Sequence, residues 1–76
     1  MRILLVDDDP GISWCVGRCL TRAGCNVARC VDGADAIQLM GERQFDVLVT
    51  DIQMPRVNGI ALIEWAIANR PQMRVI

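Results

Sequence analysis

Three consecutive carboxylates, Asp7, Asp8 and Asp9, follow an apolar run at residues 3–6. Asp9 has a structural explanation, because Asp followed by Pro10 is a good N-cap with proline at the first helical position. That explanation does not account for Asp7 and Asp8, whose like charges repel each other at so short a separation. Adjacent acids at the end of a buried strand also indicate a cation site, so both interpretations stay open at this point.

A further carboxylate, Asp51, ends the apolar run of the stretch DVLVTDIQMP. If the two runs are neighbouring parallel strands, their carboxyl ends lie at one edge and Asp7, Asp8 and Asp51 converge. Such oxygens suit a hard cation such as magnesium, which takes one or two carboxylates together with phosphate oxygens. A carboxylate beside that cation can attack phosphorus and form an aspartyl-phosphate. Read alone, Asp51 also fits a helix or turn cap.

The elements that must position these acids alternate between strand and helix. The patterns predict strands at residues 2–6, 26–31, 46–50 and 73–76, and helices at 10–23, 33–41 and 59–69. This alternation with short connections predicts an α/β fold with a parallel sheet and right-handed crossovers. The first and third strands are apolar on both faces, as buried parallel strands are, whereas the mixed second strand is expected at an edge.

Length and composition limit the classes of protein. The 76 residues allow one domain with a thin core, although 53% of them are hydrophobic. The net charge of −1 gives no sign of a nucleic-acid or anionic-membrane partner, and no apolar run approaches a membrane span. We therefore expect a cytoplasmic protein. All eight basic residues are arginine and there is no histidine, so the chain offers neither a histidine base nor a phosphate-binding lysine.

The four cysteines, Cys15, Cys19, Cys25 and Cys30, lack the paired C-x2-C spacing of common zinc sites. Cys15 and Cys19 are one helical turn apart, on the same apolar stripe of the predicted helix as Ile12. We expect the cysteines to be small buried hydrophobes, with zinc binding and a regulatory disulfide as the alternatives.

Three stretches, LLVDDDP, DVLVTDIQMP and NGIALIEWA, occur in an order and spacing that resemble the receiver domain of two-component response regulators. The resemblance covers all 76 residues, and DIQMP and the surroundings of Ser13 and Trp14 are similar to the nitrogen-regulatory branch. It implies a flavodoxin-like fold, with a parallel sheet in the order 2-1-3-4-5 flanked by helices. Residues 1–76 would form the N-terminal part of that domain, about three βα units and the start of a fourth strand.

The resemblance also implies a role for each acid. Asp51 would accept a phosphoryl group from a sensor histidine kinase. Asp8 would ligate Mg²⁺ directly, and Asp7 would hold the ion through water or tune it. The backbone carbonyl of Gln53 would be a further ligand, and the following Met54-Pro55 would shape the loop. The domain would be a phospho-accepting signalling module, not an enzyme.

The family's Ser or Thr after the fourth strand and Lys after the fifth have no counterpart in these 76 residues. The sheet face that the family's last helix covers is therefore expected to be open. Exposed apolar surface and a free strand edge favour self-association, as a dimer or by exchange of segments.

Two functional hypotheses follow. In the first, the chain is a Mg²⁺-dependent phospho-acceptor that regulates an output, transcription in the nitrogen-regulatory branch, within a longer parent. In the second, it is a non-signalling fragment that self-associates or occupies a kinase. A metal-dependent phosphohydrolase is a weaker third alternative, because the D-x-D motif it needs is not completed at Asp51-Ile52-Gln53. Neither main hypothesis gives the chain itself a nucleic-acid or membrane contact.

Overall fold

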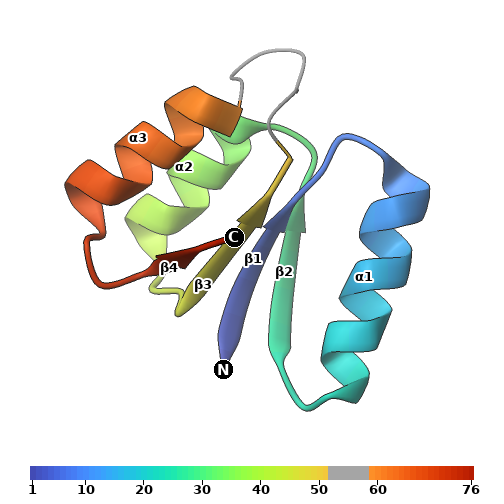
Figure 1. The fold of residues 1–76 in the computed structure, drawn as a ribbon. Helices are drawn as coiled ribbons and strands as arrows, with labels where there is room; N and C mark the ends of the chain where they lie inside the picture. Colours follow the sequence, from blue (N-terminus) through green and yellow to red (C-terminus); the bar gives the residue numbers. More distant parts are fainter. Residues whose placement is uncertain (52–58) are drawn as a thin grey trace.

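The structure, a computed structural model, describes residues 1–51 and 59–76. Within these residues, strands and helices alternate along the chain (Figure 1). The elements are β1 (Arg2–Val6), α1 (Pro10–Arg22), β2 (Asn26–Cys30), α2 (Gly33–Glu42), β3 (Val47–Thr50), α3 (Gly59–Asn69) and β4 (Arg74–Val75). Each lies within two residues of its predicted bounds, so the hydrophobic patterns located every element.

The sheet is parallel, with the strand order β2-β1-β3-β4. This order confirms the expected flavodoxin-like α/β fold, and it confirms that β2 is an edge strand. Helices α2 and α3 lie side by side over one face of the sheet, while α1 packs against β2 and β1 (Figure 1). The carboxyl ends of β1 and β3 therefore lie next to each other at the same edge of the sheet.

The core lies between the sheet and the helices α2 and α3. Its largest fully buried side chains are Leu4, Val6, Met40, Leu48 and Leu62. These five side chains come from β1, β3, α2 and α3. Burying their apolar surface stabilises the packing of these elements by about 25 cal/mol for each Å² removed from water. All four apolar residues of β1 are buried, as the sequence predicts for a central parallel strand.

Helix α1 begins and ends as the sequence predicts. A carboxylate oxygen of Asp9 accepts hydrogen bonds from the backbone N–H groups of Gly11, at 2.9 Å, and Ile12, at 3.2 Å. At the other end, Gly24 adopts a φ of 92°. The backbone N–H groups of Gly24 and Cys25 donate back to carbonyls of the last turn at 3.0 and 3.1 Å. This is the Schellman ending, which favours glycine at that position.

The buried face of α1 is not the one predicted. Cys15 and Cys19 are exposed, so the expectation that they are buried hydrophobes is wrong. Cys25 is half-buried, and the expectation holds in full only for Cys30. The buried residues of the helix are the small Ser13 and Gly17. Their size lets α1 approach β2 closely, since a Cβ on Gly17 would lie only 3.0 Å from the Arg29 Cδ. Part of the apolar stripe of the helix therefore points away from the sheet.

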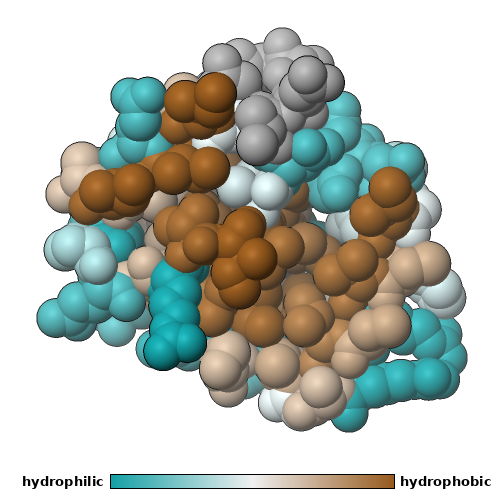
Figure 2. All heavy atoms as spheres, in the orientation of Figure 1, coloured by the Kyte–Doolittle hydropathy of each residue, from teal (hydrophilic) through white to brown (hydrophobic). Residues whose placement is uncertain are grey.

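Apolar side chains lie at the surface on α1 and after β4. Ile12 is 53% exposed, and Ile76, which follows β4, is 75% exposed. Figure 2 shows hydrophobic residues gathered across the middle of this face of the molecule. Among the described residues, no helix combines the length and the apolar character needed to span a membrane.

Candidate functional site

Backbone pairing sets the positions of Asp7 and Asp51. In the parallel ladder between β1 and β3, Val6 is the partner of Thr50, so the next residue of each strand leaves the sheet at the same level. The Asp7 N–H donates to the Cys30 carbonyl at 3.1 Å, and the Asp51 N–H donates to the Val6 carbonyl at 3.1 Å. Both aspartates are therefore anchored through their main chains at the carboxyl edge of the sheet.

The three acids predicted to converge do so. Asp7, Asp8 and Asp51 each offer a carboxylate oxygen, and these three oxygens all lie within 4.8 Å of one another. Asp7 is half-buried, whereas Asp8 and Asp51 are exposed. Three negative charges this close repel one another, and the repulsion between two unit charges at about 4–5 Å in water is about 1 kcal/mol. A cation would remove that cost.

Local hydrogen bonds fix the acidic turn. A carboxylate oxygen of Asp7 accepts a hydrogen bond from the Asp9 N–H at 2.9 Å, while the Asp9 side chain caps α1. The Thr50 hydroxyl donates to the Asp51 carbonyl at 2.9 Å. Asp9 is thus committed to the helix, as predicted, and the other three acids form the cluster.

The cluster has the donor chemistry of a Mg²⁺ site. All of its donors are hard carboxylate oxygens, and two of the three side chains are open to solvent, where Mg²⁺ can keep several of its waters. Among the described residues, no other acid or cysteine belongs to this group. The sequence resemblance implies a further ligand at the Gln53 carbonyl and a loop shaped by Met54-Pro55. These residues lie outside the described part of the chain.

The neighbouring β2 ends in a different kind of environment. Cys30 is buried, and Asp32 behind it is buried as the N-cap of α2, where its carboxylate accepts a hydrogen bond from the Asp35 N–H at 3.0 Å. Burial, with added contributions from the charges of Asp35 and Asp32, raises the pKa of the Cys30 thiol to about 11. Cys30 is therefore a neutral core residue, and Asp32 caps the start of α2.

The strand order and the acid cluster together define a flavodoxin-like domain with an acidic site at the carboxyl edge of its sheet. The family model described as the response regulator receiver domain matches residues 3–76. The chain belongs to this family.

Curated relatives connect the chain to several regulators. It is 34% identical over 74 residues to the DNA-binding transcriptional regulator NtrC of Escherichia coli K12, a match that covers 97% of this chain and 16% of NtrC. It is 35% identical over 77 residues to protein-glutamate methylesterase/protein-glutamine glutaminase 2 of Caulobacter vibrioides, covering 100% of this chain and 22% of that protein. The chain therefore spans less than a quarter of each relative. The similarity to NtrC agrees with the predicted nitrogen-regulatory resemblance.

Solved structures share the fold. The receiver domain of the hybrid histidine kinase CckA superposes with a TM-score of 0.92 at 28% identity, covering 99% of this chain and 71% of that one. The response regulator TrrA of Thermotoga maritima, in complex with Mg²⁺–BeF, gives 0.93 at 24% identity, covering 97% and 64%. TrrA has also been solved in complex with the histidine kinase ThkA, with a TM-score of 0.91 over the same shares.

Proposed function

We propose that this chain is a phospho-acceptor of two-component signalling, in which Asp51 receives a phosphoryl group with the help of Mg²⁺. The observation that carries the proposal is the convergence of three carboxylate oxygens within 4.8 Å at the edge where β1 and β3 end. Membership of the receiver family and the Mg²⁺–BeF complex of the structurally similar TrrA support it.

The roles follow from the burial of each acid. Asp51 is exposed at the strand end, so one of its carboxylate oxygens can approach phosphorus in line with the leaving group. Asp8, also exposed, is the proposed direct ligand of Mg²⁺. Asp7 is half-buried and already accepts the Asp9 N–H, which suits holding the ion through water. The Gln53 carbonyl completes the proposed ligand set from outside the described residues.

The proposed reaction is a phosphoryl transfer from a phosphohistidine. An Asp51 oxygen forms a bond to phosphorus while the bond between phosphorus and the histidine nitrogen breaks, and the imidazole leaves. Bound Mg²⁺ would offset the negative charge shared by the carboxylates and the phosphoryl group. In this proposal the chain positions the acceptor and the metal ligands and keeps the group on its own Asp51, so it acts as the receiver of the group and not as an enzyme.

The proposed partner is a sensor histidine kinase in the cytoplasm, and the complex of TrrA with ThkA supports this kind of partner. The proposed output is control of transcription in a longer protein, supported by the similarity to NtrC. This chain itself would contact neither nucleic acid nor membrane.

Intact-mass spectrometry tests the proposal. The chain is incubated with Mg²⁺ and acetyl phosphate, beside Asp51→Asn and beside Glu64→Gln, which removes an exposed acid of α3 that is not part of the cluster. We expect a phosphate-sized mass gain in the parent and in Glu64→Gln. The gain should be lost in Asp51→Asn and on chelation of Mg²⁺. A folded parent that gains no mass would contradict the proposal.

Self-association is the second candidate function, favoured by the exposure of two large apolar side chains of α1, Ile12 and Trp14. The proposed product is a dimer, formed by apolar contact or by exchange of segments, that buries these side chains. Sedimentation velocity at micromolar concentration should then show a concentration-dependent shift toward a species of twice the mass. A single compact monomer over the whole concentration range would refute this candidate.

A further inference from the structure

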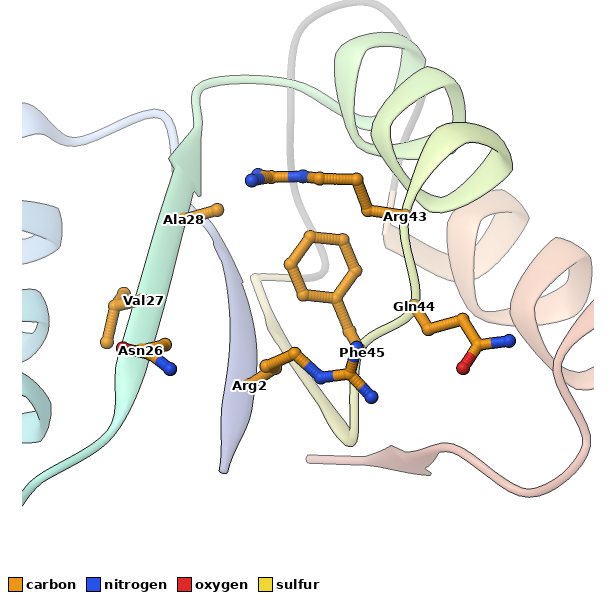
Figure 3. Close-up of a pocket in the computed structure, with 7 residues that line it drawn as sticks. All are labelled: Arg2, Asn26, Val27, Ala28, Arg43, Gln44 and Phe45. Atoms are coloured by element: carbon orange, nitrogen blue, oxygen red, sulfur yellow. The ribbon is translucent and has the colours of Figure 1, made fainter.

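A second candidate site lies at the opposite edge of the sheet from the acid cluster. An open hollow of about 520 Å³ is bounded by the start of β1, by β2 and by the connection from α2 to β3 (Figure 3). All of its lining residues belong to the described part of the chain. Its volume falls within the roughly 300–1,000 Å³ typical of pockets for small molecules.

The charge of the hollow comes from two arginines, and no carboxylate lines it. Arg2 is partly neutralised, because an Asp46 oxygen accepts its backbone N–H at 2.7 Å and lies 3.8 Å from its Nε. Arg43 has no such partner, since its guanidinium makes no hydrogen bond or ion pair with any residue that the structure describes. Within the described part of the chain, the hollow therefore carries one arginine without a carboxylate partner.

An aromatic ring holds that cation over the hollow. The Arg43 guanidinium carbon lies 5.3 Å from the centroid of the Phe45 ring, a cation–π distance. In Figure 3, the Arg43 side chain extends above the ring toward Ala28 on β2, and Arg2 lies on the other side of the ring. Since a guanidinium presents a planar fork of donors, this arrangement offers Arg43 to a bidentate carboxylate or phosphate.

The remaining lining suits the organic part of a ligand. Ala28 and Phe45 are half-buried and supply apolar surface, whereas Asn26 is exposed and supplies an amide group. Apolar walls with a few polar groups and one fixed charge are the usual make-up of a small-molecule site.

We propose that this hollow binds a small organic oxyanion, with a phosphate or carboxylate head on a flat apolar body. The head pairs with Arg43, and the body lies against Phe45 and Ala28. Binding is non-covalent and involves no transfer of the head group. The site is separate from the acid cluster, because Arg2 begins β1 whereas Asp7 follows its last residue.

The test is a titration of the isotope-labelled chain followed by backbone amide NMR shifts. Phenylphosphonate is the phosphorus probe, benzoate is the carboxylate probe, and inorganic phosphate is the head group without a body. We expect saturable shifts at residues 26–28 and 43–45 with at least one aromatic probe, and weaker binding of inorganic phosphate. The stronger of the two aromatic probes identifies the head group.

Matched variants assign the binding to the arginine. Arg43→Gln should weaken the aromatic probe about tenfold or more, as expected for loss of one charged hydrogen-bonding group, and Arg43→Glu should abolish binding. Arg22→Gln makes the same charge change in the last turn of α1, outside the hollow, and should bind like the parent.

Three outcomes would overturn the proposal: no saturable shift in the parent, shifts centred on the acid cluster, or equal affinities for Arg43→Gln and Arg22→Gln. The map of NMR shifts in the parent still shows whether a probe binds in the hollow, even if a variant at Arg43 fails to fold. Because neither aromatic probe carries a transferable phosphoryl group, a negative result leaves the proposed phosphorylation of Asp51 untouched.

Discussion

Val6 and Thr50 are direct partners in the parallel ladder of β1 and β3. This single pairing places Asp7 and Asp51 next to each other, because each follows its strand by one residue. Because β1 and β3 pack in the core on both of their faces, a shift of the register by one residue would disrupt that packing, so the core that fixes the register also fixes the acid cluster.

The acid cluster should make stability depend on Mg²⁺. Without metal, Asp8→Asn removes one of three mutually repelling charges, so the free energy of unfolding should rise by up to about 1 kcal/mol. With Mg²⁺, the parent should gain stability because the ion binds the folded state, by about 2.7 kcal/mol at a hundred times the dissociation constant. Asp8→Asn should lose most of this gain. Thermal melts with and without Mg²⁺ measure both effects.

Asp9→Asn is the matched control for that experiment. It removes the same charge one residue away, and asparagine caps a helix about as well as aspartate does. Its melting temperature should still rise with Mg²⁺ to nearly the extent seen in the parent. If Asp8→Asn and Asp9→Asn responded alike, the assignment of Asp8 as a ligand would be wrong.

The alternation of apolar patterns made the fold and the acid cluster predictable. Strands such as β1 are buried on both faces, so their composition alone marks them, and parallel strands bring their carboxyl ends together by topology. Asp9-Pro10 and Gly24 also mark the start and the end of α1, because they favour the backbone conformations found at those two positions. These features depend on neighbours in sequence or on a general rule of the fold.

Features that depend on contacts between distant side chains could not be predicted. Helix α1 buries the small residues Ser13 and Gly17, and no periodicity of apolar residues marks that face. The hollow beside Arg43 combines residues from β1, β2 and the connection before β3, which have no common motif. In both cases, the relevant neighbours are defined only once the chain is folded.

The cysteines should differ sharply in reactivity. Cys15 and Cys19 are exposed on α1, whereas Cys30 is buried and its thiol has a pKa raised to about 11 by burial and by nearby acids. Because the thiolate is the reactive form, a thiol reagent at neutral pH should modify Cys15 and Cys19 first and Cys30 only after unfolding. Peptide mass mapping over a time course, native and in denaturant, reads this order. Early modification of Cys30 in the native protein would contradict the burial.

The raised pKa of Cys30 also predicts a loss of stability in alkali. The pKa of this thiol rises from an ordinary value of 9.0 to about 11 in the folded protein. Between these values the unfolded chain loses this proton more readily than the folded one, so the contribution of Cys30 to stability is complete below pH 9 and falls as the pH rises toward 11. Cys30→Ala should flatten the decline of the free energy of unfolding over this range. An unchanged slope in denaturant titrations from pH 8 to pH 11 would refute the assignment.

Helix α3 should depend on one of its faces. Leu62 is 0% exposed in the core, whereas Ile67, on the same helix, is 62% exposed. Leu62→Ala should cost about 2–5 kcal/mol, a large part of the stability of so small a domain. Ile67→Ala should cost less than about 1 kcal/mol, since surface changes are usually small. Chemical denaturation of the two variants compares them, and equal losses would mean that α3 packs by a different face.

Two glycines should respond to alanine with opposite signs. Gly41 lies in α2, and a Cβ added there would have no atom within 4 Å, so Gly41→Ala should raise the free energy of unfolding by about 0.5–1 kcal/mol through its better helix propensity. Gly24 ends α1 with a φ of 92°, a conformation that costs an L-residue about 1–2 kcal/mol, so Gly24→Ala should lower the free energy of unfolding. For a domain of this size, 1 kcal/mol corresponds to about 4–8 °C in melting temperature, so thermal melts resolve both changes. If both variants shifted the melting temperature in the same direction, the backbone conformation assigned to Gly24 or to Gly41 would be wrong, because only that conformation distinguishes the two substitutions.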